Sequence, residues 1–172
     1  MNHKELAKNL KNGKIFIVPG NEAYELICDI SSKTALKKLV SGGIEGMPSI
    51  IAYDKAWLDK NLYINKKYVE KLPGPFTFLF KAKKNNELAK YGLKENIIAV
   101  RLTNNDLART ISKNKILLFS YIIKRKGKLV IASDAIPSNI KKLADFMIDA
   151  GTLESKPHIV LDLTGKIAKI IK

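Results

Sequence analysis

The sequence predicts a single mixed α/β (α+β) domain, in which a twisted, mixed β-sheet is flanked by helices. Two observations predict this fold class: short apolar strand patterns alternate with amphipathic helix patterns along the chain, and several neighbouring strand patterns are spaced as hairpins. No linker or repeat interrupts the alternation. At 172 residues the chain is long enough for one sizeable core and short for two ordinary domains. We therefore expect one domain over residues 1–172.

The first half of the chain alternates helix and strand patterns separated by residues that favour turns. Gly13 ends the first helix and Pro19-Gly20 ends the first strand. In order, the predicted elements are a helix over residues 4–10, a strand over 15–18, a helix from Ser31 or Ser32 to residue 40, a strand over 48–53, a short helix that Asp54 caps and that contains Trp57, and a helix over 66–72. The helix ending at residue 40 has apolar residues at helical spacing, so one face is expected to lie against the core.

The second half of the chain is richer in strands. Its predicted elements are a strand over 76–81, helical turns around 87–91, a strand over 97–102, a helix over 105–112 capped by Asn104 or Asn105, strands over 116–123 and 128–132, an amphipathic helix over 138–149, and a hairpin of strands 158–163 and 166–171. Residues 124–127, Lys-Arg-Lys-Gly, are expected to form a basic hairpin turn. Gly151 is expected to follow the end of the last helix.

The segment Leu72-Pro73-Gly74-Pro75-Phe76-Thr77 joins a rigid turn to an aromatic strand. Proline fixes φ near −65°, and glycine permits backbone angles that other residues avoid. Thr77 falls on the opposite strand face from Phe76 and Phe78, so its hydroxyl is held on a fixed platform. Taken alone, these residues are more often an ordinary turn into a strand.

Positive charge is the dominant feature of the composition. The chain has 31 Lys+Arg against 16 Asp+Glu, a formal net charge of +15. Such an excess favours polyanionic partners and phosphate contacts. Only Arg101, Arg109 and Arg125 are arginine, which makes the bidentate reading of base edges less favoured than phosphate contact. A lysine-rich chain also fits a heat-loving organism or an AT-rich genome.

Several classes of protein are disfavoured by what the sequence lacks. The single cysteine, Cys28, permits no internal disulfide and is expected to be a small buried residue, and His3 and His158 are too far apart in sequence to suggest a metal site. The longest apolar run is too short to span a membrane, and charges occupy the region where a signal peptide would be apolar. We therefore expect a cytoplasmic protein without a membrane partner. Fingerprints of P-loop, dinucleotide-binding and serine-hydrolase proteins are absent.

Several motifs, taken in order, resemble those of the YrdC family. Residues 19–26, followed by Asp29, resemble its opening P-T-[DE]-T-x-Y-G-L; residues 72–77 resemble its F/L-x-P-G-P-x-T strand; residues 100–103 resemble V-R-x-P; and residues 149–151 and 158–164 resemble its late D-x-G and S-T-x-V-D-L-T motifs. The resemblance covers nearly the whole chain in the family's order. It implies a YrdC-like domain with a concave basic face.

The resemblance also implies a chemistry. The best-known members of the family are threonylcarbamoyl-adenylate synthases, which join threonine, bicarbonate and ATP into the intermediate used to make threonylcarbamoyladenosine in tRNA. On that basis, Tyr24, Thr77, Arg101 and Ser120 are candidates for binding substrate or nucleotide. ATP with Mg²⁺ would be needed if the activity is retained, and tRNA-modification proteins would be partners. Ordinary structural roles, as a core tyrosine, a strand threonine and a strand-end ion pair, are at least as well supported for these residues.

Departures from the family pattern argue against that chemistry. Gly20 and Glu22 stand in place of two threonines, Glu45 and Met47 in place of the K-x-R pair, and His158-Ile159 in place of S-T, while residues 120–125 keep only the first serine of S-A-N-x-S-G. Losing one donor aimed at a developing negative charge typically costs ~10²–10³ in rate. We therefore predict a divergent member whose catalytic motifs are largely lost, and we assign no catalytic residue.

Three functional hypotheses remain open. The first is RNA binding, to tRNA or double-stranded RNA, with contacts from Lys81, Lys83, Lys84, Lys124, Arg125, Lys126 and Lys128. Solvated lysines on edge strands, which discourage aggregation, are the plain alternative for these residues. The second hypothesis is a retained synthase activity. The third is an interaction subunit, to which Trp57 and Phe146 would contribute if they are exposed.

Overall fold

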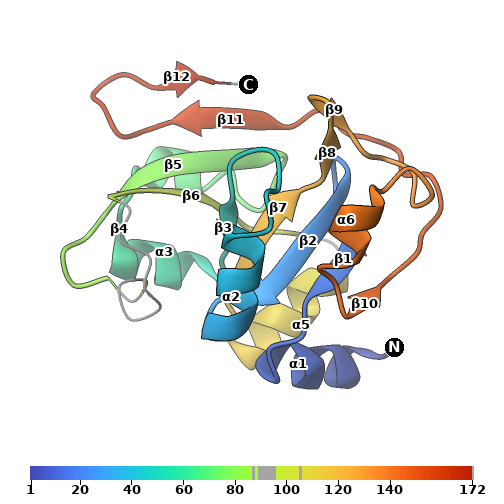
Figure 1. Ribbon diagram of the computed structural model, residues 1–172. Coiled ribbons are helices and arrows are strands. Elements are labelled where there is room, and N and C mark those ends of the chain that lie inside the picture. The colour runs from blue at the N-terminus through green and yellow to red at the C-terminus, as the bar shows by residue number, and fades with distance from the viewer. Residues whose placement is uncertain (87, 89–95, 105, 172) are drawn as a thin grey trace.

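One twisted ten-stranded sheet organises the computed structural model, and helices lie on both of its faces (Figure 1). The strand order is β10-β1-β2-β7-β3-β6-β5-β11-β12, with β4 paired to β5 outside this path. The small strands β8 and β9 form a separate hairpin. The structure describes residues 1–86, 88, 96–104 and 106–171. The predicted fold class, a mixed sheet flanked by helices, is confirmed.

The strands are β1 (Phe16–Pro19), β2 (Tyr24–Asp29), β3 (Ser49–Ile51), β4 (Leu62–Tyr63), β5 (Phe76–Ala82), β6 (Ile97–Arg101), β7 (Leu118–Ile122), β8 (Lys124–Arg125), β9 (Lys128–Leu129), β10 (Phe146–Met147), β11 (Ile159–Asp162) and β12 (Lys169–Ile170). The helices are α1 (His3–Lys11), α2 (Lys33–Val40), α3 (Lys55–Asn61), α4 (Lys66–Val69), α5 (Asp106–Asn114) and α6 (Ser138–Lys141).

The two faces of the sheet carry two apolar clusters. The larger cluster joins one strand face to α2, α3, α4 and α6, and the smaller joins the other face to α1 and α5. Strand alternation assigns side chains to these faces: Ile50 belongs to the larger cluster and Ile51 to the smaller one. We call the face that carries the smaller cluster the α1/α5 face. A buried polar residue lies on this face when its neighbours along the strand belong to the larger cluster.

Local signals explain why most helices begin where they do. The Ser32 hydroxyl accepts a hydrogen bond from the Ala35 N–H at 3.3 Å, and the Asp54 carboxylate accepts one from the Trp57 N–H at 2.7 Å. Both predicted caps are confirmed. The helix predicted over residues 66–72 is shorter and ends at Val69.

The strand β2 is missing from the predicted elements. Its six residues are all buried, and they pair with β1 on one side and β7 on the other. A strand buried on both faces has no clear alternation of apolar and polar residues. Residues 19–26 were therefore interpreted only as a family motif, and the central strand within them was not predicted.

The helix predicted over residues 138–149 is wrong. Only Ser138–Lys141 is helical, and the chain then extends to form β10, which pairs in parallel with β1. The Asp145 carboxylate accepts hydrogen bonds from the Ile15 N–H at 2.8 Å and from Lys14 at 3.2 Å. Desolvation opposes ionisation of this carboxyl, but these two bonds and the charges of Lys14 and Lys38 outweigh it and lower the pKa of Asp145. Backbone pairing beside β1 has overridden helical spacing.

Smaller differences concern the hairpin, two predictions that fall outside the described residues, and two aromatic residues. Lys124 and Arg125 form a strand, and the turn consists of Lys126 and Gly127, whose φ angles are 51° and 77°. The turns predicted around residues 87–91 lie outside the described residues except for the buried Leu88, as does the predicted cap Asn105. Trp57 is buried rather than exposed. Phe146 is 38% exposed, and its ring stacks on Phe16.

No helix in the described part of the chain combines the length and the apolar character needed to cross a membrane.

Candidate functional site

A buried polar cluster lies in the middle of the sheet, on the α1/α5 face. It consists of Arg101, Glu25, Ser120 and Ser49, which are 4%, 2%, 1% and 8% exposed. These residues come from the four adjacent strands β6, β2, β7 and β3. Their strand neighbours Val100, Leu26, Phe119 and Ile50 all belong to the larger core, so the four polar side chains share the opposite face.

Hydrogen bonds join the cluster around one guanidinium group. The Arg101 Nη2 group donates to Glu25 Oε2, with which it forms an ion pair, and to Ser120 Oγ at 3.1 Å. The Arg101 Nε–H donates to Ser49 Oγ at 3.3 Å, and Ser120 Oγ donates to Glu25 Oε2 at 2.9 Å. A buried charge requires such pairing because its desolvation is costly. The positive charge of Arg101 is thus neutralised inside the fold.

A cavity of about 230 Å³ adjoins this cluster. Its lining residues are Glu22, Gly46, Met47, Ser49, Thr77, Ile122, Lys124, His158, Val160 and Ile171. Thr77 Oγ1 and His158 Nε2 lie 2.7 Å apart, so the hydroxyl and the imidazole are hydrogen-bonded at the cavity wall. Ser49 lines the cavity and accepts the bond from Arg101, which links the cavity to the buried cluster. The cavity therefore offers a hydroxyl, an imidazole, an ammonium and a carboxylate.

The β8–β9 hairpin lies against this cavity. Glu45 Oε1 accepts a hydrogen bond from the Gly127 N–H at 2.8 Å, which attaches the loop before β3 to the hairpin turn. A Cβ atom placed on Gly46 would lie 3.9 Å from the Lys124 ammonium. Lys124, predicted as an RNA contact, therefore lines the cavity instead of pointing only to the outside. Glu45 occupies a position where the family pattern has a lysine.

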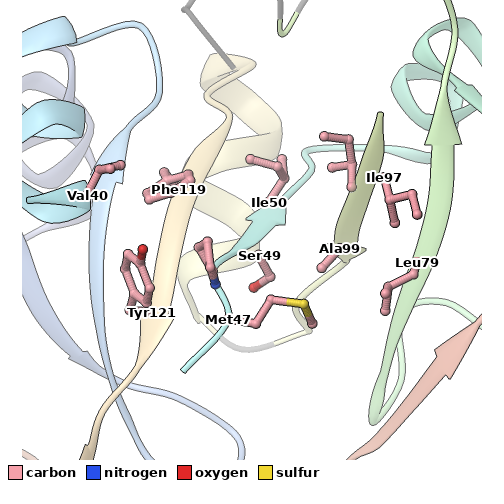
Figure 2. A pocket seen from close by; sticks show the side chains of 11 residues that line it. Val40, Met47, Ser49, Ile50, Leu79, Ile97, Ala99, Phe119 and Tyr121 are labelled. Atoms are coloured by element: carbon pink, nitrogen blue, oxygen red, sulfur yellow. The ribbon is translucent and has the colours of Figure 1, made fainter. Parts of the chain in front are cut away.

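A second, apolar cavity of about 380 Å³ lies next to the first (Figure 2). Its labelled lining residues come from the end of α2, the segment before β3, and strands β3, β5, β6 and β7. Met47 and Ser49 line both cavities, so the segment entering β3 forms their common wall. Val40, Met47 and Ile97 are 57%, 53% and 48% exposed, which leaves apolar surface at the rim.

The structure separates the four predicted substrate-binding residues. Thr77 lines the 230 Å³ cavity, whereas Arg101 and Ser120 belong to the buried cluster beside it. Tyr24 lies on the other face, within the larger core. Its hydroxyl donates to the Gly151 carbonyl and accepts from the Ala150 N–H, both at 2.9 Å. Tyr24 thus attaches the loop before Gly151 to the sheet.

The seven predicted RNA contacts fall into two groups. Lys81, Lys83 and Lys84 lie at the end of β5, and the other four belong to the β8–β9 hairpin. The hairpin and this end of β5 are on opposite sides of the molecule in Figure 1. Lys83 donates to the Asp59 carbonyl, and its ammonium lies 6.0 Å from the centre of the Tyr63 ring. The two groups therefore do not form one continuous patch, and the concave basic face stays a prediction.

Three of the site residues, Glu25, Ser49 and His158, were not predicted from the sequence. His158 was noted there only as a departure from the family pattern. Glu25 had a usable signal, because a carboxylate within the run of residues 23–28 requires a buried partner if that run is a strand. Ser49 and His158 had none, since their neighbours in space come from distant strands.

Two further expectations concern cofactors and cysteine. Among the described residues, no group of three or more His, Cys, Asp and Glu side chains is arranged to hold a metal ion. In the lining of the 230 Å³ cavity, the Lys124 ammonium is accompanied by the Glu22 carboxylate, so a triphosphate with its metal would meet one cationic side chain and one opposing carboxylate there. Cys28 is buried as expected, and burial followed by the nearby Asp29 charge raises its pKa to about 12.

Known proteins share this sequence pattern and fold. The family model Sua5/YciO/YrdC, described as telomere recombination, matches residues 8–172. Over 104 residues the chain is 36% identical to the threonylcarbamoyl-AMP synthase of Buchnera aphidicola subsp. Acyrthosiphon pisum, an alignment that covers 55% of this chain and 59% of the synthase. Over 175 residues it is 21% identical to the uncharacterized protein YciO of Escherichia coli K12, covering 95% of this chain and 84% of YciO.

Solved structures agree on the fold. The crystal structure of E. coli YciO has a TM-score of 0.81 at 19% identity, covering 99% of this chain and 87% of that one. P. abyssi Sua5 complexed with L-threonine has a TM-score of 0.78 at 17% identity, covering 99% of this chain and 53% of Sua5. The chain thus corresponds to about half of Sua5.

Proposed function

The chain belongs to the Sua5/YciO/YrdC family, and from this premise we propose that it is a divergent member that binds RNA and has lost the adenylate-forming chemistry. The observation that carries the proposal is the exposed cationic surface of the β8–β9 hairpin. Arg125, Lys126 and Lys128 are all exposed there, on a chain with a net charge of +15. Contacts from such residues to phosphates are electrostatic and largely independent of sequence.

The proposed loss of adenylate-forming chemistry is supported by the partners of the charged side chains at and beside the cavity. Arg101, the cation that the family resemblance places at the substrate, is paired with Glu25. Glu45 adds a carboxylate where the family pattern has a lysine, and it is bound to the hairpin turn. A site that stabilises transferring phosphate needs cations aimed at the developing charge. The cavity retains Lys124 for this purpose, and Glu22 opposes it.

The proposal is tested by tRNA and duplex-RNA binding measured over a range of salt concentrations. Arg125→Gln/Lys126→Gln/Lys128→Gln removes three exposed charges from the hairpin. The matched control Lys4→Gln/Lys8→Gln/Lys11→Gln removes three exposed charges from α1 and gives the same net charge. Each lost phosphate contact reduces the slope of log affinity against log salt by roughly 0.7–0.9. We expect the hairpin variant to reduce the slope by about 2 and the control to reduce it by much less.

Equal effects of the two variants would show that only net charge matters and that the hairpin is not the binding surface. Absence of salt-dependent binding by the unmodified protein would remove the RNA proposal altogether. The tRNA-modification proteins expected as partners would then be the next candidates for the basic surface.

A second candidate function, a retained threonylcarbamoyl-adenylate synthase, is favoured by the position of Lys124. This residue brings a cation into the same cavity as the hydrogen-bonded Thr77 and His158. Release of pyrophosphate from ATP and Mg²⁺ with threonine and bicarbonate tests it, with Lys124→Gln as the inactive comparison. No release above the buffer blank would reject the second candidate and leave the RNA proposal unaffected.

A further inference from the structure

We propose that Glu25 prevents anionic ligands from binding to Arg101. The Glu25 carboxylate, which belongs to the fold itself, occupies the place at the guanidinium that a ligand's carboxylate or phosphate would otherwise take. The proposal concerns what the cavity accepts, and it is independent of RNA binding. It assigns Glu25 a role in ligand specificity and Gly20 the role of making room for it.

Arg101 is placed as a ligand-binding residue would be. The register Phe78↔Val100 puts Thr77 opposite Arg101 on the neighbouring strand. On the other side, Ser49 accepts a hydrogen bond from Arg101. Both Thr77 and Ser49 line the 230 Å³ cavity. The guanidinium therefore lies between two cavity-lining residues, and what turns it away from a ligand is the ion pair with Glu25 on β2.

Glu25 replaces an external anion because it satisfies the same chemistry. A guanidinium presents a planar fork of donors that fits a carboxylate or phosphate. The Glu25 carboxylate accepts from Arg101 and from Ser120, so both donors are directed at one acceptor, Oε2. A ligand anion that entered would have to displace a 2% exposed carboxylate and would leave it buried without its cation. Anions are therefore rejected at this position.

Gly20 makes this arrangement sterically feasible. A Cβ atom on Gly20 would lie 2.0 Å from Glu25 Oε1 and 2.6 Å from the Ala23 carbonyl oxygen. Residue 20 must lack a side chain for Glu25 to reach Arg101. The family pattern has threonine at residue 20 and glycine at residue 25, so the two positions have exchanged large and small residues. The exchange is reciprocal, as expected for two positions that share one volume.

The test is rescue of an opened site by a small carboxylate. Glu25→Gly removes the internal carboxylate, leaves Arg101 unpaired and lowers the thermal midpoint. Sodium acetate, titrated against chloride at constant ionic strength, is the probe, and inorganic phosphate is the second probe. A ligand that binds the folded state raises the midpoint in proportion to the logarithm of its concentration. We expect acetate to bind Glu25→Gly about ten- to a hundredfold more tightly than the unmodified protein.

Two controls make the result decisive. Glu25→Gln/Arg101→Gln has neither charge and should show no acetate dependence. Lys124→Gln in the Glu25→Gly background should retain the rescue, because the anion binds Arg101 and not the cavity lysine. If Glu25→Gly does not fold even with acetate, the same titration is made on Glu25→Ala, which also empties the volume of the carboxylate.

An equal rise of the midpoint in the unmodified protein would overturn the proposal, because Arg101 would then be open already. A midpoint independent of acetate in both Glu25 variants would also overturn it, since Glu25 would then be a structural partner only. RNA affinity of the folded Glu25 variant should match that of the unmodified protein. This separates failure of the closed-site proposal from failure of the RNA proposal.

Discussion

Substituting Gly20 by alanine gives the sharpest test of how tightly residues 20 and 25 share space. The added Cβ would meet Glu25 Oε1 at 2.0 Å and the Ala23 carbonyl oxygen at 2.6 Å, so the carboxylate must move by more than an ångström and the backbone at Ala23 must shift as well. That movement breaks its bond to Arg101, and disrupting a buried ion pair costs about 3–5 kcal/mol. Because the displaced glutamate can recover part of its contacts, we expect a loss of about 2–4 kcal/mol in the free energy of unfolding. This corresponds to a fall of roughly 4–16 °C in the thermal midpoint.

The expected loss of stability is opposite in sign to the usual effect of replacing glycine by alanine. Where the backbone tolerates it, Gly→Ala stabilises a protein by about 0.4–1 kcal/mol through the unfolded state. Gly165→Ala is the matched control, because its nearest atom is 3.9 Å away and its φ is not in the left-handed region. Urea unfolding followed by circular dichroism measures both variants. A Gly20→Ala protein within about 0.5 kcal/mol of the parent would refute the argument, as would a Gly20→Ala cost that persists undiminished when Glu25 is also glycine.

Three further predictions concern a helix cap, a carboxylate and the thiol. Asp54→Ala removes the cap on the Trp57 N–H and should cost about 1 kcal/mol of unfolding free energy, measured in urea; no change would mean that the cap is dispensable. The pKa of Asp145 is lowered in the folded state, so its contribution is present above the unfolded pKa and disappears as pH falls below about 5; Asp145→Asn should therefore flatten the acid side of a stability–pH curve, and an unchanged curve would count against it. Cys28, with a pKa of about 12 and a buried side chain, should react with a thiol reagent at pH 8 only after denaturation, whereas rapid labelling of the folded protein would contradict the burial.

Local signals in the sequence were sufficient for much of the fold. Ser32 and Asp54 cap helices as predicted, and the strand patterns around residues 76–81 and 97–102 correspond to β5 and β6. The incorrect predictions concern segments whose structure is decided by tertiary contacts. The spacing over residues 138–149 is genuinely helical, yet the chain there gains more from backbone pairing with β1.

The candidate site was only partly predictable, for a related reason. Thr77 and Arg101 carry recognisable strand motifs, and both lie at or beside the cavity. Their partners come from far along the chain: His158 is 81 residues from Thr77, and Glu25 is 76 residues from Arg101. Neither pairing leaves a local pattern. In the sequence, Glu25 is recognisable only as a charged residue within an apolar run. That charge indicates a buried partner only once the run is known to be a buried strand.

The position of β3 constrains how this protein can be made. Its two neighbours in the sheet, β6 and β7, both come from the second half of the chain. During synthesis, Ile50 and Ile51 therefore have no strand to pair with until at least residue 97 has left the ribosome, and β7 follows later. The β1–β2 hairpin can form early, because its strands are close in sequence. A stalled nascent chain that ends before β6 should therefore be cut readily by protease across residues 49–51, whereas the full-length chain should resist cleavage there.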